Sequence, residues 1–423
     1  MFTRNEIERT FLLHRPEVIR TISLPIQRLA ALPSIVTSLL NLVRFELYGI
    51  TWHFNLDPAI EFVQQHTKLH GTIRELKVAG PNDVEARQLK KPKLHGIIQA
   101  IKHPRVIDLS RYKEAVRDLN SFQIQNVDRL EQLLFNIEYI PPSRPPPTPK
   151  LESSATVLAA PSPQVQNGAP LGQEDHTLDL IRECSSLTTL HIGVQSPTAF
   201  SWAVNCYDSN PSSMLLRPKV LHISSAGAST AKRIVEDCVY AFRNSLEDLK
   251  GVALSLSRAS SSPSIKIASF GWSWPLHQLS VLSLQGELAT WFDLESLRFC
   301  PKLTEFKLRL QPNPPAKADF LEKVFLAPHL KVFSLTGLWI VTDSVMDSLG
   351  DGLAKLQSLV IIGCDCQSVT GDGLKRALSK MKTLERAQLD LGEKMEVVLE
   401  RYRGERPGLE IRGATHDILG RRD

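Results

Sequence analysis

The sequence predicts an α/β solenoid, in which short parallel strands form a curved inner sheet and helices cover its outer side. Three observations predict this fold. A short apolar pattern, LxxLxL or a close variant, returns every 24 to 28 residues in the second half of the chain. Between copies the apolar period changes from two residues to about 3.6, which indicates a strand followed by a helix. A unit of this size cannot bury its own apolar face, so successive units must stack.

Five consecutive copies show the strand pattern most clearly. They read LSVLSL, LTEFKL, LKVFSL, LQSLVI and LERAQL, and they begin at Leu279, Leu303, Leu330, Leu356 and Leu384. Looser copies, LTTLHI and PKVLHI, begin at residues 187 and 218. LVRFEL, IRELKV, PRVIDL and IRTISL carry the same anchors nearer the amino terminus, and a degenerate LEI at residue 409 ends the series.

Two segments between copies have the apolar spacing of a helix. After Thr370 apolar residues fall at i, i+3, i+4 and i+7, and after Thr342 they again follow one helical face. Threonine suits the position before a helix, because its hydroxyl accepts a hydrogen bond from a backbone N–H of the first turn. The two apolar faces consist of Val345, Met346, Leu349 and Leu353, and of Leu374, Ala377, Leu378 and Met381.

One stretch matches a known repeat closely. Residues 330–349, LKVFSLTGLWIVTDSVMDSL, resemble LxxLxLxxCxxITDxGLxxL, the repeat of the cysteine-containing, ribonuclease-inhibitor-like subclass of leucine-rich-repeat proteins. Leu338 stands at the cysteine position, and residues 341–343 stand in the ITD slots. The next repeat has Cys364 at the cysteine position, followed by VTGDGL after a two-residue insertion. The resemblance implies a leucine-rich-repeat solenoid.

The chain divides into three predicted parts. Residues 1–140 form an amino-terminal array of degenerate repeats, residues 141–177 form a linker, and residues 178–423 form a carboxy-terminal array. The linker is rich in Pro, Ser and Ala and has few large apolar residues, so it is predicted to be disordered. Its RPPPTPK run resembles an SH3 ligand, although neither common orientation is complete. A flexible spacer, modified at Thr148 or Ser162, is the competing interpretation.

Composition indicates a folded protein inside the cell. Apolar residues make up 42% of the chain, and Glu6 and Glu8 stand where a secretory signal would be apolar. No run of about 18 uncharged apolar residues predicts a membrane span. The net charge of +5 is spread over interspersed acids and bases, and the KKPK at 90–93 is interpreted as a solvated loop. We expect a cytoplasmic or nuclear protein that binds neither nucleic acid nor membrane.

The sequence contains no motif that couples a spacing to a reaction. GxxxxGK[ST], GxSxG, HExxH and GxGxxG are all missing, so we predict a non-enzymatic protein with no cofactor and no metal. His191 and His222 share one position in successive copies, which would place them about 4.8 Å apart on parallel strands. Without an obvious third ligand, they are predicted to be a solvated or partner-contacting pair.

The six cysteines are too dispersed for a disulfide framework and are expected to be reduced. Cys184 and Cys300 each precede a copy by three residues, at a position that elsewhere holds Ala, Leu or Met, so both are predicted to be buried. Cys364 is predicted to cap the core, whereas Cys366 belongs to the insertion and is predicted to be exposed. Neither a metal nor a disulfide is expected at this pair.

The candidate binding site is the concave face. In a strand that reads LxxLxL, the leucines point inward and the intervening residues point outward, where they form columns from repeat to repeat. A mixed polar and apolar surface of this kind suits a protein or peptide partner. The predicted partner-binding residues are His191, His222, Ser283, Gln285, Glu305, Lys307, Arg309, Ser334, Thr336, Val360, Ile362, Arg386, Gln388 and Asp390.

The resemblance also implies a function. Many proteins with this repeat are F-box substrate receptors, which bind a Skp-type adaptor and a cullin in SCF-type ubiquitin ligases. LPSIVTSLL, from Leu32, resembles the opening of an F-box, but the downstream arginine and the tryptophan-bearing helix are missing. The leading expectation is a non-catalytic solenoid that recognises a substrate for such a ligase. The alternative is a scaffold or regulator with no connection to a ubiquitin ligase.

Overall fold

The computed structural model describes a series of segments between residues 18 and 413. They are residues 18–25, 33–49, 56–79, 94–111, 126–137, 184–194, 218–225, 228–253, 271–310, 324, 326–391 and 393–413. The predicted linker at 141–177, its RPPPTPK run with Thr148 and Ser162, the KKPK run, and Glu6, Glu8 and Leu32 lie outside these residues.

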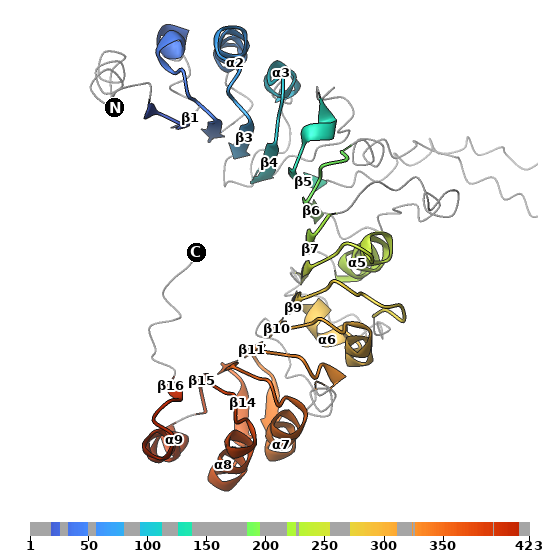
Figure 1. The fold of residues 1–423 in the computed structure, drawn as a ribbon, viewed down its shortest axis with the longest axis vertical. Coiled ribbons are helices and arrows are strands. Elements are labelled where there is room, and N and C mark those ends of the chain that lie inside the picture. The colour runs from blue at the N-terminus through green and yellow to red at the C-terminus, as the bar shows by residue number, and fades with distance from the viewer. Residues whose placement is uncertain are drawn as a thin grey trace, which may run out of the picture.

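A single parallel sheet of fourteen strands forms the inner side of the described chain. Its spatial order follows the order of the sequence, and every neighbouring pair is parallel, which confirms the predicted α/β solenoid. Figure 1 shows the strands on the inside of an arc and the helices on its outside. The strands are β1 (Thr21–Pro25), β2 (Arg44–Tyr48), β3 (Glu75–Ala79), β4 (Val106–Arg111), β5 (Gln132–Ile137), β6 (Thr189–Val194), β7 (Val220–Ser225), β8 (Asp248–Ala253), β9 (Val281–Gly286), β10 (Glu305–Arg309), β11 (Val332–Thr336), β13 (Ser358–Ile362), β15 (Arg386–Leu389) and β16 (Glu410–Gly413).

The sheet continues across the predicted linker. β5, on the amino-terminal side, pairs in parallel with β6 over six residues, from Gln132↔Thr189 to Ile137↔Val194. The two predicted arrays are therefore joined through one continuous sheet. β5 and β8 were not among the copies identified from sequence, although LEQLLF and LEDLKG begin with the same LxxL anchors. In β8 the third anchor is Gly251, and a Cβ there would lie only 3.1 Å from Leu288, so this neighbour fills the space.

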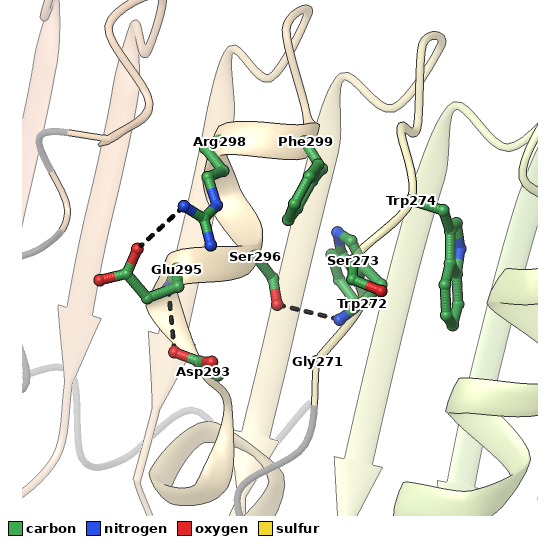
Figure 2. A pocket seen from close by; sticks show the side chains of 9 residues that line it. All are labelled: Gly271, Trp272, Ser273, Trp274, Asp293, Glu295, Ser296, Arg298 and Phe299. Atoms are coloured by element: carbon green, nitrogen blue, oxygen red, sulfur yellow. Dashed lines mark hydrogen bonds and ion pairs between the residues drawn. The ribbon is translucent and has the colours of Figure 1, made fainter.

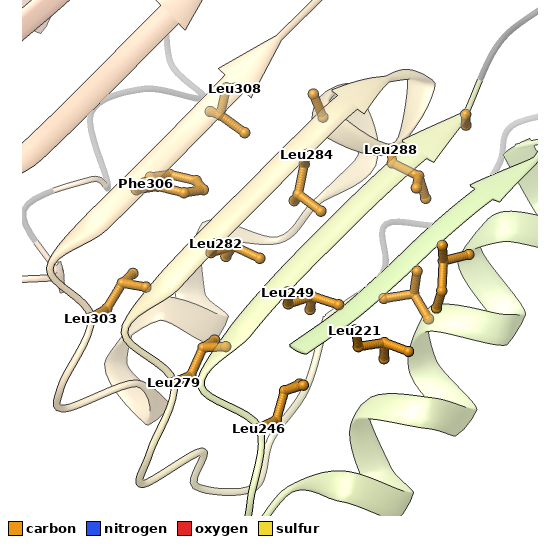
Figure 3. Packing of buried hydrophobic residues seen from close by; sticks show 14 of the residues in the cluster. Leu221, Leu246, Leu249, Leu279, Leu282, Leu284, Leu288, Leu303, Phe306 and Leu308 are labelled. Atoms are coloured by element: carbon orange, nitrogen blue, oxygen red, sulfur yellow. The ribbon is translucent and has the colours of Figure 1, made fainter. Parts of the chain in front are cut away.

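The core consists of the anchors that alternate with the outward residues. Leu249, Leu282 and Phe306 occupy equivalent positions on three adjacent strands, and all three are fully buried. Figure 3 shows these side chains in rows on the helix side of the sheet, where each strand repeats the contact made by the one before. Burying one leucine contributes about 1.5 to 3 kcal/mol, so stability grows with each stacked repeat.

The outer side carries short and varied helices. They are the 3₁₀ helices η3 (Pro33–Ser38), η5 (Val127–Arg129) and η8 (Leu294–Phe299), and the α-helices α2 (Asp57–Leu69), α3 (Leu94–Ala100), α5 (Ala228–Phe242), α6 (Glu287–Trp291), α7 (Asp343–Gly352), α8 (Gly371–Lys380) and α9 (Glu393–Glu405). None of the helices in the described segments has the length and apolar character needed to cross a bilayer.

The two helices predicted from sequence start where the threonines place them. The Thr342 hydroxyl accepts from the Val345 N–H at 3.3 Å and starts α7, while the Thr370 hydroxyl accepts from the Gly373 N–H at 3.0 Å and starts α8. All four residues of the predicted apolar face after Thr370 are buried, as are those after Thr342. The predictions for these helices are confirmed.

A second, two-stranded sheet changes the interpretation of the cysteine pair. β12 (Ile340–Thr342) pairs in parallel with β14 (Asp365–Ser368), so the insertion is part of a strand. Cys366 is buried at 8% exposure and Cys364 is half-buried, so the prediction of an exposed Cys366 was wrong. Leu338, at the equivalent cysteine position, is exposed. Cys184 and Cys300 are buried as predicted, and all five described cysteines are free thiols.

Two glycines end strands where no other residue fits. Gly286 is the last residue of β9 and has a φ of +72°, and a Cβ there would lie 1.9 Å from the Ala253 carbonyl oxygen. Gly337 follows β11 with φ of +96°, and a Cβ would lie 2.3 Å from the Leu310 carbonyl oxygen. The backbones of neighbouring repeats therefore approach closely at the carboxyl ends of the strands, which a side chain would prevent.

Candidate functional site: the concave face

Outward side chains of the parallel strands form aligned columns on the concave face. Because neighbouring strands pair in register, the middle outward residues stand side by side about 4.8 Å apart. In the carboxy-terminal half this column consists of Ser283, Lys307, Ser334, Val360 and Gln388. The next column consists of Gln285, Arg309, Thr336 and Ile362. The structure thus brings these sequence-predicted residues together on one face.

The remaining predicted residues extend this face in both directions. Glu305 and Arg386 stand in the first outward column, at the starts of β10 and β15. Asp390 follows β15 and is outside the strand, and its carboxylate accepts from the Gly363 N–H at 3.4 Å. His191 and His222 lie in the middle column on β6 and β7, three and two strands before Ser283.

The two histidines form a stacked pair. Their ring centroids are 4.0 Å apart and the planes differ by 17°. His191 Nε2 lies 3.4 Å from the Ser224 hydroxyl oxygen. Burial, together with the neighbouring ring and Lys250, lowers the pKa of His222 to about 3, and burial also lowers the pKa of His191. Both rings are therefore neutral near pH 7, and they present a flat, uncharged surface.

The histidine pair has no third metal ligand beside it. No group of three or more His, Cys, Asp or Glu side chains with the geometry to hold a metal ion occurs within the described segments. Two stacked imidazoles do not complete a zinc site, which needs at least three protein ligands. The pair is better suited to packing against a partner.

Opposite charges meet across the amino-terminal strands. The guanidinium of Arg44 on β2 lies 2.6 Å from the carboxylate of Glu75 on β3, and Lys77 lies 3.8 Å from Asp108 on β4. Sequence reasoning did not select these residues. The signal was present in LVRFEL and IRELKV, whose outward residues carry complementary charges once the strands are in register. These charges satisfy one another within the chain.

Like charges occupy the same outward columns on two of the central strands, β8 and β10. Asp248 on β8 and Glu305 on β10 both face Val281 on the intervening β9, while Lys250 and Lys307 both face Ser283. Burial raises the pKa of Asp248, and the nearby Glu305 carboxylate raises it further. The two acidic side chains stand two strands apart, or about 9.6 Å, and Lys250 and Lys307 lower the pKa of Asp248, so the four residues place an acidic column beside a basic one.

Two basic side chains on the central strands, Lys250 and Arg309, have no counter-ion within the described part of the chain. Lys307 forms an ion pair with Glu305 on its own strand, but neither Lys250 nor Arg309 has a described carboxylate within 4 Å. Arg309 stands one outward position beyond Lys307. Together Lys250 and Arg309 provide a positively charged region beside the acidic Asp248. The half-buried Val360 and Ile362 add apolar surface on β13, two strands away from β10.

Strand order, register and the columned concave face define a solenoid of the leucine-rich-repeat type. No family model matches the chain, and no curated protein matches it. An internalin from Listeria monocytogenes aligns at 12% identity over 99% of this chain and 86% of its own, with a TM-score of 0.33. The leucine-rich repeat-containing protein LegL7 from Legionella pneumophila aligns at 9% identity over 85% of this chain and 97% of its own, with a TM-score of 0.35. At these values the fold assignment rests on the sheet itself.

The described thiols are poorly suited to nucleophilic chemistry. Burial raises the pKa of Cys300, Cys364 and Cys366 to about 12 in each case. Since the thiolate is the reactive form, these cysteines remain protonated near neutral pH.

Proposed function

We propose that the chain is a protein-interaction solenoid that binds a protein partner on the concave face between β6 and β15. The observation that carries this proposal is the alignment of like charges on β8 and β10, with Lys250 and Arg309 lacking a described counter-ion. A partner with an acidic group opposite Lys250 and Arg309, and a basic group opposite Asp248, would be electrostatically complementary to this face.

The proposed face is of moderate size. The eight strands from β6 to β15 span roughly 34 Å at a spacing of about 4.8 Å, and three outward columns add roughly 16 Å. That surface is about two-thirds of the roughly 800 Å² that each partner contributes to a standard interface. The neutral His191–His222 stack on β6 and β7 and the apolar Val360 and Ile362 on β13 would contact the partner on either side of the charged central strands.

The finer proposal is that the partner is a substrate presented to an SCF-type ubiquitin ligase. It depends on the resemblance of the repeats to those of F-box receptors. The alternative is a scaffold or regulator without a ligase connection. It is favoured by the burial of apolar residues in the stretch that resembles an F-box. Residues 33–38 form η3, and Ile35, Val36 and Leu39 are buried in the solenoid core, so these apolar side chains are used by the repeat and are not available to an adaptor.

Charge reversal tests the concave site. The full-length tagged chain would carry Lys250→Glu and Arg309→Glu, and bound proteins would be quantified after affinity purification. The expected result is a loss of at least about tenfold in a specific bound protein, with an unchanged melting temperature, because both side chains are exposed. Arg401→Glu on α9, outside the concave face, is the matched control. Equal capture by all three chains would contradict the proposal. Recovery of a cullin and its adaptor would support the ligase function, and capture of a partner without them would support the scaffold.

A further inference from the structure

A small cleft on the outer side of the solenoid is lined by aromatic and acidic side chains. It has a volume of about 270 Å³ and lies between the segment that precedes β9 and the 3₁₀ helix η8 that follows it. Figure 2 shows Trp272, Ser273 and Trp274 on one side, and η8 with Ser296, Arg298 and Phe299 on the other. The cleft is far from the concave columns, because helices and strands occupy opposite sides of the repeat.

The segment that forms one wall is held to η8 by hydrogen bonds from two of its backbone N–H groups. The Trp272 N–H donates to the Ser296 hydroxyl at 2.9 Å, and the Leu276 N–H donates to the Phe299 carbonyl at 2.8 Å. A Cβ on Gly271 would lie 2.2 Å from the Ser296 hydroxyl oxygen, so this approach depends on glycine. The wall is thus fixed against η8 by the chain itself.

Aromatic rings continue from the cleft toward α5. The indole of Trp274 meets the ring of Tyr240 edge to face, with centroids 5.3 Å apart, and the Arg243 guanidinium lies 4.5 Å from the Tyr240 centroid. On η8 the Arg298 guanidinium lies 5.0 Å from the centroid of Phe299. Trp274 and Phe299 are only partly buried, so each leaves part of its ring accessible.

This surface differs from the rest of the outer side. Between α7 and α8 the contact is made by ion pairs, with Arg376 2.6 Å from Asp347 and Lys380 2.8 Å from Asp351. Such pairs saturate a surface with internal partners. The cleft has one such pair, Arg298 with Glu295 at 3.8 Å, and it also presents partly exposed rings in a row, which is the surface used by domains that bind proline-rich segments in the polyproline II conformation.

The acidic side chains lie at one end of the row. Asp293 and Glu295 line the cleft on the side of the later repeats, whereas Trp274 lies on the side of the earlier ones (Figure 2). The Asp293 carboxylate accepts from the Glu295 N–H at 3.0 Å and so remains on the rim of the cleft. A basic group at one end of a proline-rich segment would find a complementary charge there.

We propose that this cleft binds the proline-rich segment RPPPTPK, residues 144–150, of the same chain. Prolines three residues apart lie on one side of a polyproline II helix, so Pro146 and Pro149 can contact the aromatic row together. The segment carries Arg144 at one end and Lys150 at the other. Because the chain reaches the cleft from β5, on the side of the earlier repeats, Lys150 is the cation expected beside Asp293 and Glu295.

The length of the chain permits this contact. β5 and β9 are four strand spacings apart, or roughly 19 Å within the sheet. The twelve residues from Ile137 to Pro149 span up to about 40 Å when extended, and the 34 residues from Lys150 to Cys184 leave ample length for the return. An intramolecular segment also has an effective concentration on the order of millimolar, so weak contacts suffice.

Fluorine NMR of the full-length chain labelled with 5-fluorotryptophan tests the proposal. The six tryptophans would be assigned by single Trp→Phe substitutions, and the chain would be compared with a variant in which Pro145, Pro146, Pro147 and Pro149 are alanine. The resonances of Trp272 and Trp274 are expected to shift while the other four do not. Pro161→Ala with Pro163→Ala, in the same linker, is the control and should leave all six unchanged.

A synthetic peptide added to the protein tests whether the proline-rich segment is what occupies the cleft. A peptide of residues 141–152 should restore the two resonances in the alanine variant, and should bind wild type at least about tenfold more weakly because the cleft is already occupied. In the alanine variant, Glu295→Lys should weaken the peptide by at least about threefold, and the exposed Glu385→Lys should not. Spectra that are identical with and without the prolines would overturn the proposal and indicate another occupant, such as residues 254–270. A shift lost on dilution would overturn it in favour of docking between two copies.

Discussion

The imidazole rings of His191 and His222 stack on the concave face with their centroids 4.0 Å apart. They come from adjacent repeats 31 residues apart and meet because β6 and β7 pair in register. Both rings are neutral near pH 7, since burial lowers the pKa of both. Protonation of these two histidines should therefore lower the stability of the fold.

Acid is expected to destabilise the fold through this pair. The ordinary histidine pKa is 6.5, and that of His222 in the folded chain is about 3, so below pH 6.5 the unfolded chain binds more protons. The contribution of the neutral ring is complete above pH 6.5 and is lost as the pH falls toward 3. The slope is at most about 1.4 kcal/mol per pH unit for each histidine. Urea denaturation at pH 7.5 and at pH 4.5 measures this change in the free energy of unfolding.

His222→Gln provides the comparison for this titration. The carboxylates titrate in both chains, so the difference between the two pH dependences isolates the histidine. The variant should lose less stability between pH 7.5 and 4.5 than wild type does. Parallel pH profiles for the two chains would show that the stacked pair does not carry the effect.

Truncation of two adjacent residues on β9 should change the stability of the fold by very different amounts. Leu282 is fully buried between Leu249 and Phe306, so Leu282→Ala should lower the free energy of unfolding by about 2 to 5 kcal/mol. Ser283 points outward, and Ser283→Ala should change it by less than about 0.5 kcal/mol. Denaturant titration measures both, and comparable losses would contradict the assignment of faces.

Gly373 should not tolerate a methyl group. The Asp343 carboxylate accepts from the Thr370 N–H at 2.8 Å and the Thr370 hydroxyl at 2.6 Å, and a Cβ on Gly373 would lie 2.0 Å from it. Gly373→Ala should displace the carboxylate and cost about 1 to 3 kcal/mol. Gly404→Ala, in α9 with open space around it, should be neutral or stabilise by up to about 1 kcal/mol. Thermal unfolding of both variants tests the contrast, and equal melting temperatures would exclude the clash.

Cys366 should resist alkylation while the chain is folded. Burial raises the pKa of its thiol to about 12, so at pH 8 only about one molecule in 10⁴ carries the reactive thiolate. Labelling with iodoacetamide, followed at this site by mass spectrometry, should be at least about tenfold slower in the native chain than in urea. Rapid native labelling would return Cys366 to the exposed position predicted from its sequence.

Much of the fold was predictable because the apolar anchors repeat. The copies from residue 279 onward fixed β9, β10, β11, β13 and β15 and the caps of α7 and α8. β5 and β8 were missed: Gly251 replaces an anchor in β8, and β5 is followed by the predicted linker instead of by another copy. The aromatic cleft was also missed, since Trp272 and Phe299 belong to different repeats and no periodic pattern connects them.

The sequence by itself determined which side chains face inward and which face outward. The physical reason is that a strand alternates its side chains, and only one side of each repeat is apolar enough to be buried. The tertiary structure decided which outward charges meet. That depends on the register between strands that are 24 or more residues apart, which paired Arg44 with Glu75 but aligned Lys250 with Lys307. It also decided that Cys366 is buried, because β14 finds its partner strand in the preceding repeat.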